Sequence, residues 1–284
     1  MAVGAASRTT ESLRSADGSV LGYRQLGSGP GLILLHGGMM AAQNFMRLAE
    51  LLSDSFTVYV PDRRGRGTSG AYGARYGIAR DCEDVQTLVE KTGSERIFGL
   101  SSGAIIALEA ALVVPRLSQV AAYEPPYSIA GRDNAFWLER FDAEVAAGEL
   151  GAALATLLFG TGDPPFLRFV PRALLAKLFG LAISDDAKKT KPGDVSMREL
   201  IPTMHYDALL VRETSPEVER LRHLQARVLL LGGSKSAAFL RRGLDALEAL
   251  LPKATRVTLR GMGHIAADNE SKPALVAEAL RAFF

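Results

Sequence analysis

Short apolar runs recur along the chain and alternate with segments of helical spacing. Gly31–Leu35 and Arg96–Leu100 are apolar at nearly every position, which is typical of strands buried on both faces of a parallel sheet. Asp81–Lys91 has helical spacing, and Gly93 supplies a left-handed cap at its end. We predict strands at Glu11–Ser15, Val20–Leu26, Gly31–Leu35, Phe56–Val60, Arg96–Leu100, Gln119–Tyr123, Arg227–Leu231 and Thr255–Leu259, and helices at Asn44–Leu52, Asp81–Lys91, Ser102–Val114, Phe239–Leu251 and Pro273–Phe283. This α/β alternation predicts a mostly parallel sheet with helices on both faces.

Two regions depart from the alternation. Asp17-Gly18 separates the first two predicted strands, and this dipeptide favours the tight turn of a hairpin, so the sheet should begin with an antiparallel edge. Residues 125–216 contain helical patterns and turns but no convincing strand. We therefore predict a core formed by residues 1–124 and 217–284, with a helical insertion at residues 125–216. The insertion is rich in aromatic residues, some of which should form an apolar pocket wall: Phe136, Trp137, Phe141, Phe159, Phe166, Phe169 and Phe179.

Composition narrows the class of protein. The 284 residues include 33 Lys and Arg against 31 Asp and Glu, and a formal net charge of +2 argues against a nucleic-acid partner. Cys82 is the only cysteine, so no intrachain disulfide can form and a reducing, cytoplasmic environment is expected. The first eight residues do not resemble a secretory signal, and no apolar stretch is long enough to span a membrane. We expect a small-molecule substrate and no membrane partner, while the oligomeric state stays open.

The strongest chemical signal is the segment Gly99-Leu100-Ser101-Ser102-Gly103. It matches G-x-S-x-G and lies between a predicted buried strand and a predicted helix, as a nucleophile elbow must. The sharp turn strains the backbone of the serine, so the residues two before and two after it must be small. Ser101 Oγ would then stand beside a helix N-terminus, whose free N–H groups stabilise a developing anion. We predict that Ser101 is the nucleophile.

A serine hydroxyl needs a base within hydrogen-bonding reach. Of the four histidines, His264 follows the last predicted strand and precedes the last helix, so its loop can lie over the carboxyl edge of the sheet. We predict that His264 is the general base. His36 also follows a strand, but the glycines after it favour a role for backbone N–H groups. The predicted oxyanion hole combines the N–H of Ser102 with that of Gly38 or Met39.

Four motifs now suggest a family. The segments LHGG at 35–38, PDRRGRGTS at 61–69, GLSSG at 99–103 and GH at 263–264 resemble those of the α/β-hydrolase superfamily, and they occur in its order. The resemblance covers the chain from about residue 11 to the C-terminus. It implies the α/β-hydrolase fold, with an eight-stranded sheet and a helical cap inserted after the sixth strand. It also implies a structural role for Asp62 in its turn.

The third member of the expected catalytic triad departs from the commonest family pattern. Most relatives carry an acid in the loop after the strand equivalent to Arg227–Leu231, but here that loop reads GGSKSA and contains no carboxylate. Some relatives, haloalkane dehalogenases among them, supply the acid one strand earlier, which is the position of Glu124. Its role would be to accept the Nδ1–H of His264 and hold the tautomer that makes Nε2 a base. Asp207, near the end of the insertion, is the alternative acid.

These residues predict a serine hydrolase of ester-like bonds in small hydrophobic substrates, acting through an acyl-enzyme. Carboxylic esters, lactones and thioesters all fit that chemistry. No cofactor is required, and the lone histidines and Cys82 have no metal-ligand spacing. Because one fold hosts many reactions, a cofactor-free lyase, cyclase or biosynthetic enzyme is the alternative function. A binding protein with a vestigial triad is a third hypothesis, which the intact Ser101 and His264 disfavour.

Overall fold

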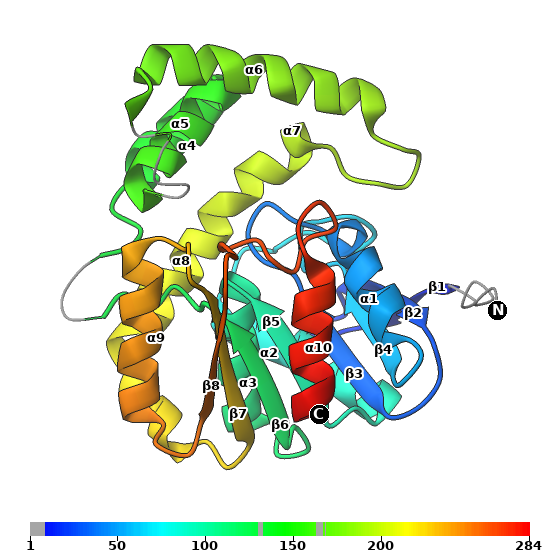
Figure 1. Cartoon of the computed structure of the whole chain (residues 1–284). Helices are drawn as coiled ribbons and strands as arrows, with labels where there is room; N and C mark the ends of the chain where they lie inside the picture. Colours follow the sequence, from blue (N-terminus) through cyan, green and yellow to red (C-terminus); the bar gives the residue numbers. More distant parts are fainter. Residues whose placement is uncertain (1–8, 130–132, 163–166, 168) are drawn as a thin grey trace.

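A computed structural model describes residues 9–129, 133–162, 167 and 169–284. In this part of the chain one sheet contains eight strands, in the order β1-β2-β4-β3-β5-β6-β7-β8 (Figure 1). The strands are β1 (Thr9–Arg14), β2 (Val20–Leu26), β3 (Gly31–Leu35), β4 (Thr57–Pro61), β5 (Arg96–Leu100), β6 (Gln119–Tyr123), β7 (Arg227–Gly233) and β8 (Thr255–Leu259). β1 and β2 are antiparallel to their neighbours and the remaining pairs are parallel. The predicted antiparallel edge and mostly parallel sheet are therefore confirmed.

Helices cover both faces of the sheet because alternate residues of its central strands point in opposite directions. Ile33 and Leu35 of β3 pack in one buried cluster with residues of α2, α3 and α9, whereas Leu32 and Leu34 pack in a second cluster with residues of α1 and α10. The helices and 3-10 segments of the core are η1 (Ala42–Phe45), α1 (Met46–Leu52), α2 (Ile78–Thr92), α3 (Ser102–Val113), η4 (Ser215–His223), α9 (Ala238–Leu250) and α10 (Pro273–Phe283). Both faces of this sheet are buried, which accounts for its uniformly apolar strands.

The described residues between β6 and β7 contain helices and no strand. They form α4 (Leu138–Ala146), α5 (Leu150–Thr161), α6 (Arg172–Lys189), α7 (Met197–Leu200), η3 (Ile201–Thr203) and α8 (Met204–Thr214). In Figure 1, α4, α5 and α6 lie beyond one edge of the sheet as a cap, and α8 runs from them to the core. The helical cap after the sixth strand is thus confirmed.

The ends of the predicted insertion pack against the core. Tyr127 at one end, and Leu210 and Val211 of α8 at the other, lie in the same buried cluster as α3. The limits 125–216 for a separate cap stay a prediction.

The predicted aromatic wall is divided in the structure. Trp137 and Phe141 are buried in the cap, whereas Phe136, Phe159 and Phe169 are exposed. Phe166 and the first eight residues lie outside the described residues. Among the helices that are described, none has the length and apolar character to cross a membrane.

Candidate active site

Ser101 joins β5 to α3 in a conformation that glycine usually occupies. Its φ is 56° and its ψ is −122°. A Cβ on Gly99 would lie 2.1 Å from the carbonyl oxygen of Gly103, and one on Gly103 would lie 2.5 Å from the carbonyl oxygen of Leu35. Contacts this short exclude a side chain at both positions, as the elbow motif requires. The backbone N–H of Ser101 donates to the carbonyl of Tyr123 at 2.9 Å, which fixes the turn against β6.

Backbone strain is concentrated at the predicted site residues. Among the described residues, the non-glycine positions with positive φ are Met39 (51°), Ser101 (56°) and Glu124 (48°). Such conformations cost about 1–3 kcal/mol each, and they persist where the surrounding structure enforces them. Each of the three follows the carboxyl end of a central strand. Open α/β sheets bind their ligands at this edge.

Glu124 and His264 form a direct pair. The Nδ1 of His264 lies 2.8 Å from Oε2 of Glu124, whose side chain is completely buried. The other carboxylate oxygen, Oε1, accepts the backbone N–H of Gly233 at 2.6 Å. Because both oxygens have partners, the carboxylate is fixed relative to the imidazole, which leaves Nε2 of His264 as the ring nitrogen available to another group.

The loop that carries His264 is held by a hydrogen bond from the end of β6. The hydroxyl of Tyr123 donates to the carbonyl of Gly263 at 2.8 Å. Leu100 and Tyr123 pair in register in β5 and β6, so Ser101 and Glu124 are the next residues on adjacent strands. No hydrogen bond joins Ser101 to His264, both of which are described; catalytic bonds of this kind often tighten only when substrate binds.

The segment after β3 lies directly against the nucleophile. A Cβ on Gly37 would be 3.2 Å from Cβ of Ser101. Nη1 of Arg66 donates to the carbonyls of Gly37 at 2.9 Å and Met40 at 3.2 Å. Arg66 therefore fixes both ends of the segment 37–40, whose Gly38 and Met39 supply the predicted oxyanion-hole N–H groups.

Among the described residues, no hydrogen bond or ion pair joins Asp207 to His264. Its Oδ1 accepts Nη1 of Arg63 at 2.9 Å and the Ser102 hydroxyl at 2.7 Å, and its Oδ2 accepts Nη2 of Arg66 at 2.5 Å. Burial alone would raise the pKa of Asp207, but Arg66 and Arg63 hold it below its usual value. The structure thus brings Glu124, and not this alternative, to the imidazole.

Two further buried groups complete the surroundings of Arg63. His36 is fully buried, its Nε2 accepts the backbone N–H of Arg63 at 3.2 Å, and burial with nearby arginines holds its pKa well below the usual value. Burial raises the pKa of Asp81 to about 6, against the opposing effect of Arg63. His36 is therefore a neutral structural residue, as its sequence context predicts.

Asp62 accepts the N–H groups of Ala42 and Thr68, in agreement with its implied structural role.

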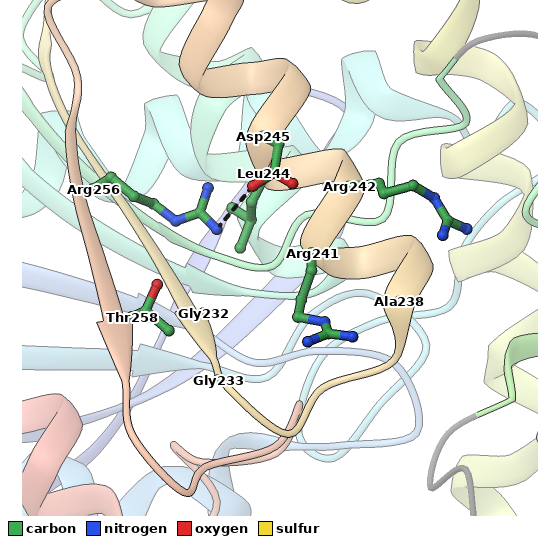
Figure 2. Close-up of a pocket in the computed structure, with 9 residues that line it drawn as sticks. All are labelled: Gly232, Gly233, Ala238, Arg241, Arg242, Leu244, Asp245, Arg256 and Thr258. Carbon is green, nitrogen blue, oxygen red and sulfur yellow. Dashed lines mark hydrogen bonds and ion pairs between the residues drawn. The ribbon is translucent and has the colours of Figure 1, made fainter.

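The loop after β7, where most relatives carry the acid, contains no carboxylate here. Figure 2 shows a pocket of about 340 Å³ between the ends of β7 and β8 and the start of α9. Asp245 of α9, an acid that follows this loop in sequence, lies 3.5 Å from Nη2 of Arg256 in this pocket. It points toward Arg256 of β8 (Figure 2) and makes no contact with His264 among the described interactions.

A family model described as the alpha/beta hydrolase family matches residues 32–279. The chain belongs to this family. Its sequence is 28% identical to that of an α/β hydrolase from Sphaerobacter thermophilus DSM 20745. The two structures have a TM-score of 0.75, and the match covers 96% of this chain and 100% of that one. A hydrolase from Pseudomonas aeruginosa PA01 has 22% identity and a TM-score of 0.72, over 97% and 98% of the two chains, and shows the shared fold.

One curated relative is matched over a shorter span. The uncharacterized hydrolase YraK of Bacillus subtilis (strain 168) is 34% identical over 96 residues, which are 32% of this chain and 35% of that protein. The alignment with this chain therefore covers about a third of the length of this relative.

The residues that position the site could not be recognised from sequence alone. They are Arg63, Arg66 and Tyr123, which make the contacts described above. A signal was present: three arginines, at 63, 64 and 66, directly follow a predicted buried strand. All three are buried in the structure, and buried guanidinium groups require carboxylate or carbonyl partners.

Proposed function

We propose that this α/β hydrolase is a serine hydrolase that cleaves ester-like bonds through an acyl-enzyme. The observation that carries the proposal is the 2.8 Å contact between His264 Nδ1 and the buried carboxylate of Glu124. Glu124 follows β6, the strand next to the one that ends at the strained Ser101 elbow. This arrangement supports Glu124 as the triad acid, since such an acid holds the imidazole tautomer and stabilises the imidazolium.

In the proposed mechanism Ser101 Oγ attacks the carbonyl carbon of the substrate and His264 Nε2 accepts the hydroxyl proton. The N–H groups of Ser102 and of Gly38 or Met39 hold the oxyanion. When the tetrahedral intermediate collapses, the alcohol leaves with the proton from His264. Water then attacks the acyl-enzyme by the same route, the carboxylic acid leaves, and Ser101 recovers its proton.

The apolar side chains beside the oxyanion segment support a hydrophobic, modest-sized acyl group. Met39 and Met204 are partly buried and pack against the apolar cluster of the cap. A Cβ on Gly38 would lie 2.8 Å from Sδ of Met204, so cap and oxyanion segment are in contact here. Unbranched thioether side chains adapt to varied apolar ligands. We extend the proposal to a cytoplasmic enzyme that acts on small molecules, without nucleic acid or membrane as partner and without a cofactor.

The test combines turnover with labelling. The chain should hydrolyse p-nitrophenyl butyrate, and a fluorophosphonate should label Ser101 alone, as located by mass spectrometry of peptides. Ser101→Ala should lower turnover on the order of 10⁶-fold and abolish labelling, because no other group can replace the nucleophile. Ser184→Ala, an exposed serine on α6, is the matched control and should leave both unchanged. Turnover that survives Ser101→Ala, or labelling at Ser102, would contradict the proposal.

A further inference from the structure

Asp207 belongs to the cap, yet its side chain is bonded to the core around the nucleophile. It lies on α8 and is 1% exposed. Its partners are Arg63 and Arg66, from the loop after β4, and Ser102, the residue after the nucleophile. We call these four residues the Asp207 network. One cap side chain thus reaches both predicted halves of the oxyanion hole.

Each contact of the network leads to one half of the hole. Arg66 uses Nη2 for Asp207 and Nη1 for the carbonyls of Gly37 and Met40. Ser102, whose backbone N–H is the other predicted donor, receives Nη1 of Arg63 at 3.0 Å and donates its hydroxyl to Asp207. The carboxylate therefore sets the position of Arg66 on one side and of Ser102 on the other.

The network is also buried enough for its charges to matter. The side chains of Arg63 and Arg66 are 4% and 0% exposed. Buried ion pairs such as those of Arg63 and Arg66 with Asp207 are stable only while each charged group keeps its partners. Loss of one partner leaves an uncompensated buried charge. If the cap shifts and carries Asp207 away, the two arginines must find other acceptors, so an intact oxyanion segment requires a seated cap.

On this basis we infer that Asp207 is a positioning residue that makes the oxyanion hole dependent on the seating of the cap helix α8. The inference rests on the proposed function, since it assigns the oxyanion hole to the acyl-transfer reaction of Ser101. It gives Asp207 a role distinct from that of a triad acid. The role is exerted through Arg66 and Ser102, with no contact to the base.

Other contacts of α8 support this dependence. Tyr206 stacks on Tyr72, with ring centroids 3.5 Å apart and 14° between the planes. Glu213 accepts the backbone N–H of Ile78, the first residue of α2, at 2.9 Å. Thus α8 contacts the core segment that follows β4 through Tyr206, Asp207 and Glu213.

The experiment measures Asp207→Asn with p-nitrophenyl butyrate and with phenylboronic acid, which forms a tetrahedral adduct on a serine nucleophile and places a hydroxyl in the oxyanion hole. The amide keeps the shape of the carboxylate, but its NH₂ group must face an arginine. Since both groups are hydrogen-bond donors, that contact is lost. We expect kcat to fall and the boronate Ki to rise, each about 10- to 100-fold, because displacing an oxyanion donor costs less than the 10²- to 10³-fold of removing one. KM should stay within a factor of about two because uniform substrate binding is retained.

Two readouts separate this role from others. Enzyme that has unfolded irreversibly lowers the measured turnover but not the boronate Ki, so a variant that has only lost active protein would leave the Ki unchanged. The pH midpoint of kcat/KM on the acid side should equal that of wild type, because Asp207 does not touch His264. Asp185→Asn, an exposed change in the same cap, is the matched control.

Arg66→Lys is the second variant, in case Asp207→Asn does not fold. An ammonium group cannot reach Asp207, Gly37 and Met40 at once, so the same loss is expected, and the double variant should lose less than the product of the two single effects. Unchanged kcat and Ki in both variants would overturn the inference, as would a shifted pH midpoint in Asp207→Asn. If wild type is phosphonylated at Ser101 but cleaves no ester, the proposed substrate class fails. The affinity for the boronate, measured as protection of Ser101 from phosphonylation, then decides the role of Asp207.

Discussion

Glu124 and Asp207 are both buried carboxylates close to the nucleophile, but they lie in different regions and have different partners. Glu124 follows a central strand and receives one imidazole and one backbone N–H. Asp207 lies on a cap helix and receives two guanidinium groups and a hydroxyl. The neighbour of each carboxylate thus determines its role: a titratable base makes Glu124 a candidate triad acid, while permanent cations make Asp207 a structural anchor.

The largest expected difference between the two regions is in turnover. Glu124→Gln keeps the size of the side chain but favours the wrong imidazole tautomer, so kcat should fall on the order of 10⁴-fold. Asp207→Asn should cost far less, as argued above. Steady-state hydrolysis of p-nitrophenyl butyrate by the two variants makes the comparison. A nearly neutral Glu124→Gln beside a crippled Asp207→Asn would reverse the two assignments.

The second expected difference is in the pH dependence of stability. Burial raises the pKa of Asp81, which neighbours the Asp207 network, to about 6 from 3.8, so the folded state binds its proton more tightly than the unfolded state. This contribution is full below pH 3.8 and is lost as the pH rises to about 6, and it amounts to about 1–3 kcal/mol. Urea unfolding at pH 4.5 and 7 should show Asp81→Asn gaining stability relative to wild type at the higher pH.

The contribution of Asp207 to stability should depend on pH in the opposite direction to that of Asp81. Its pKa is lowered in the folded state, so its contribution is present above its ordinary pKa and is lost as the pH falls through the folded value. Asp207→Asn should therefore lose stability relative to wild type at pH 7, and the loss should shrink on acidification. Parallel curves for the Asp81 and Asp207 variants would contradict the assigned charge states.

The smallest expected effect concerns the loop that carries the base. Tyr123→Phe removes the hydrogen bond to the carbonyl of Gly263, which is worth about 1 kcal/mol, or roughly a fivefold change in an equilibrium. We expect kcat to fall up to about tenfold with little change in KM, because His264 becomes less well positioned. Stopped-flow acylation rates would check this. A loss as large as that of Glu124→Gln would mean that Tyr123 has a direct role in the chemistry.

Sequence could predict the strands and the elbow because the signals for both are local. β3 and β5 are apolar in consecutive positions, and their bounds agree with the prediction. The start of α2 was missed by three residues, since the N–H of Ile78 is capped by Glu213, which lies far away in sequence. A contact of this kind leaves no mark on the local pattern.

The site residues divide in the same way. Ser101 follows from its glycine neighbours, whereas the choice between Glu124 and Asp207 depends on which side chain meets His264, a non-local fact. The partners of Asp207 could not be predicted from sequence either, because these contacts join residues more than 100 positions apart. The arginines that follow a predicted buried strand could indicate that carboxylate partners are needed. The sequence could not show which carboxylate each arginine binds.

The most direct test of the central claim, that Glu124 orients His264, is the ¹H NMR resonance of the His264 Nδ1–H. In the boronate adduct this proton should appear far downfield in wild type, since it lies between the imidazole and a buried carboxylate. His264→Ala assigns the resonance by its loss. The account predicts that it disappears in Glu124→Gln and persists in Asp207→Asn. Persistence in Glu124→Gln together with loss in Asp207→Asn would contradict the account.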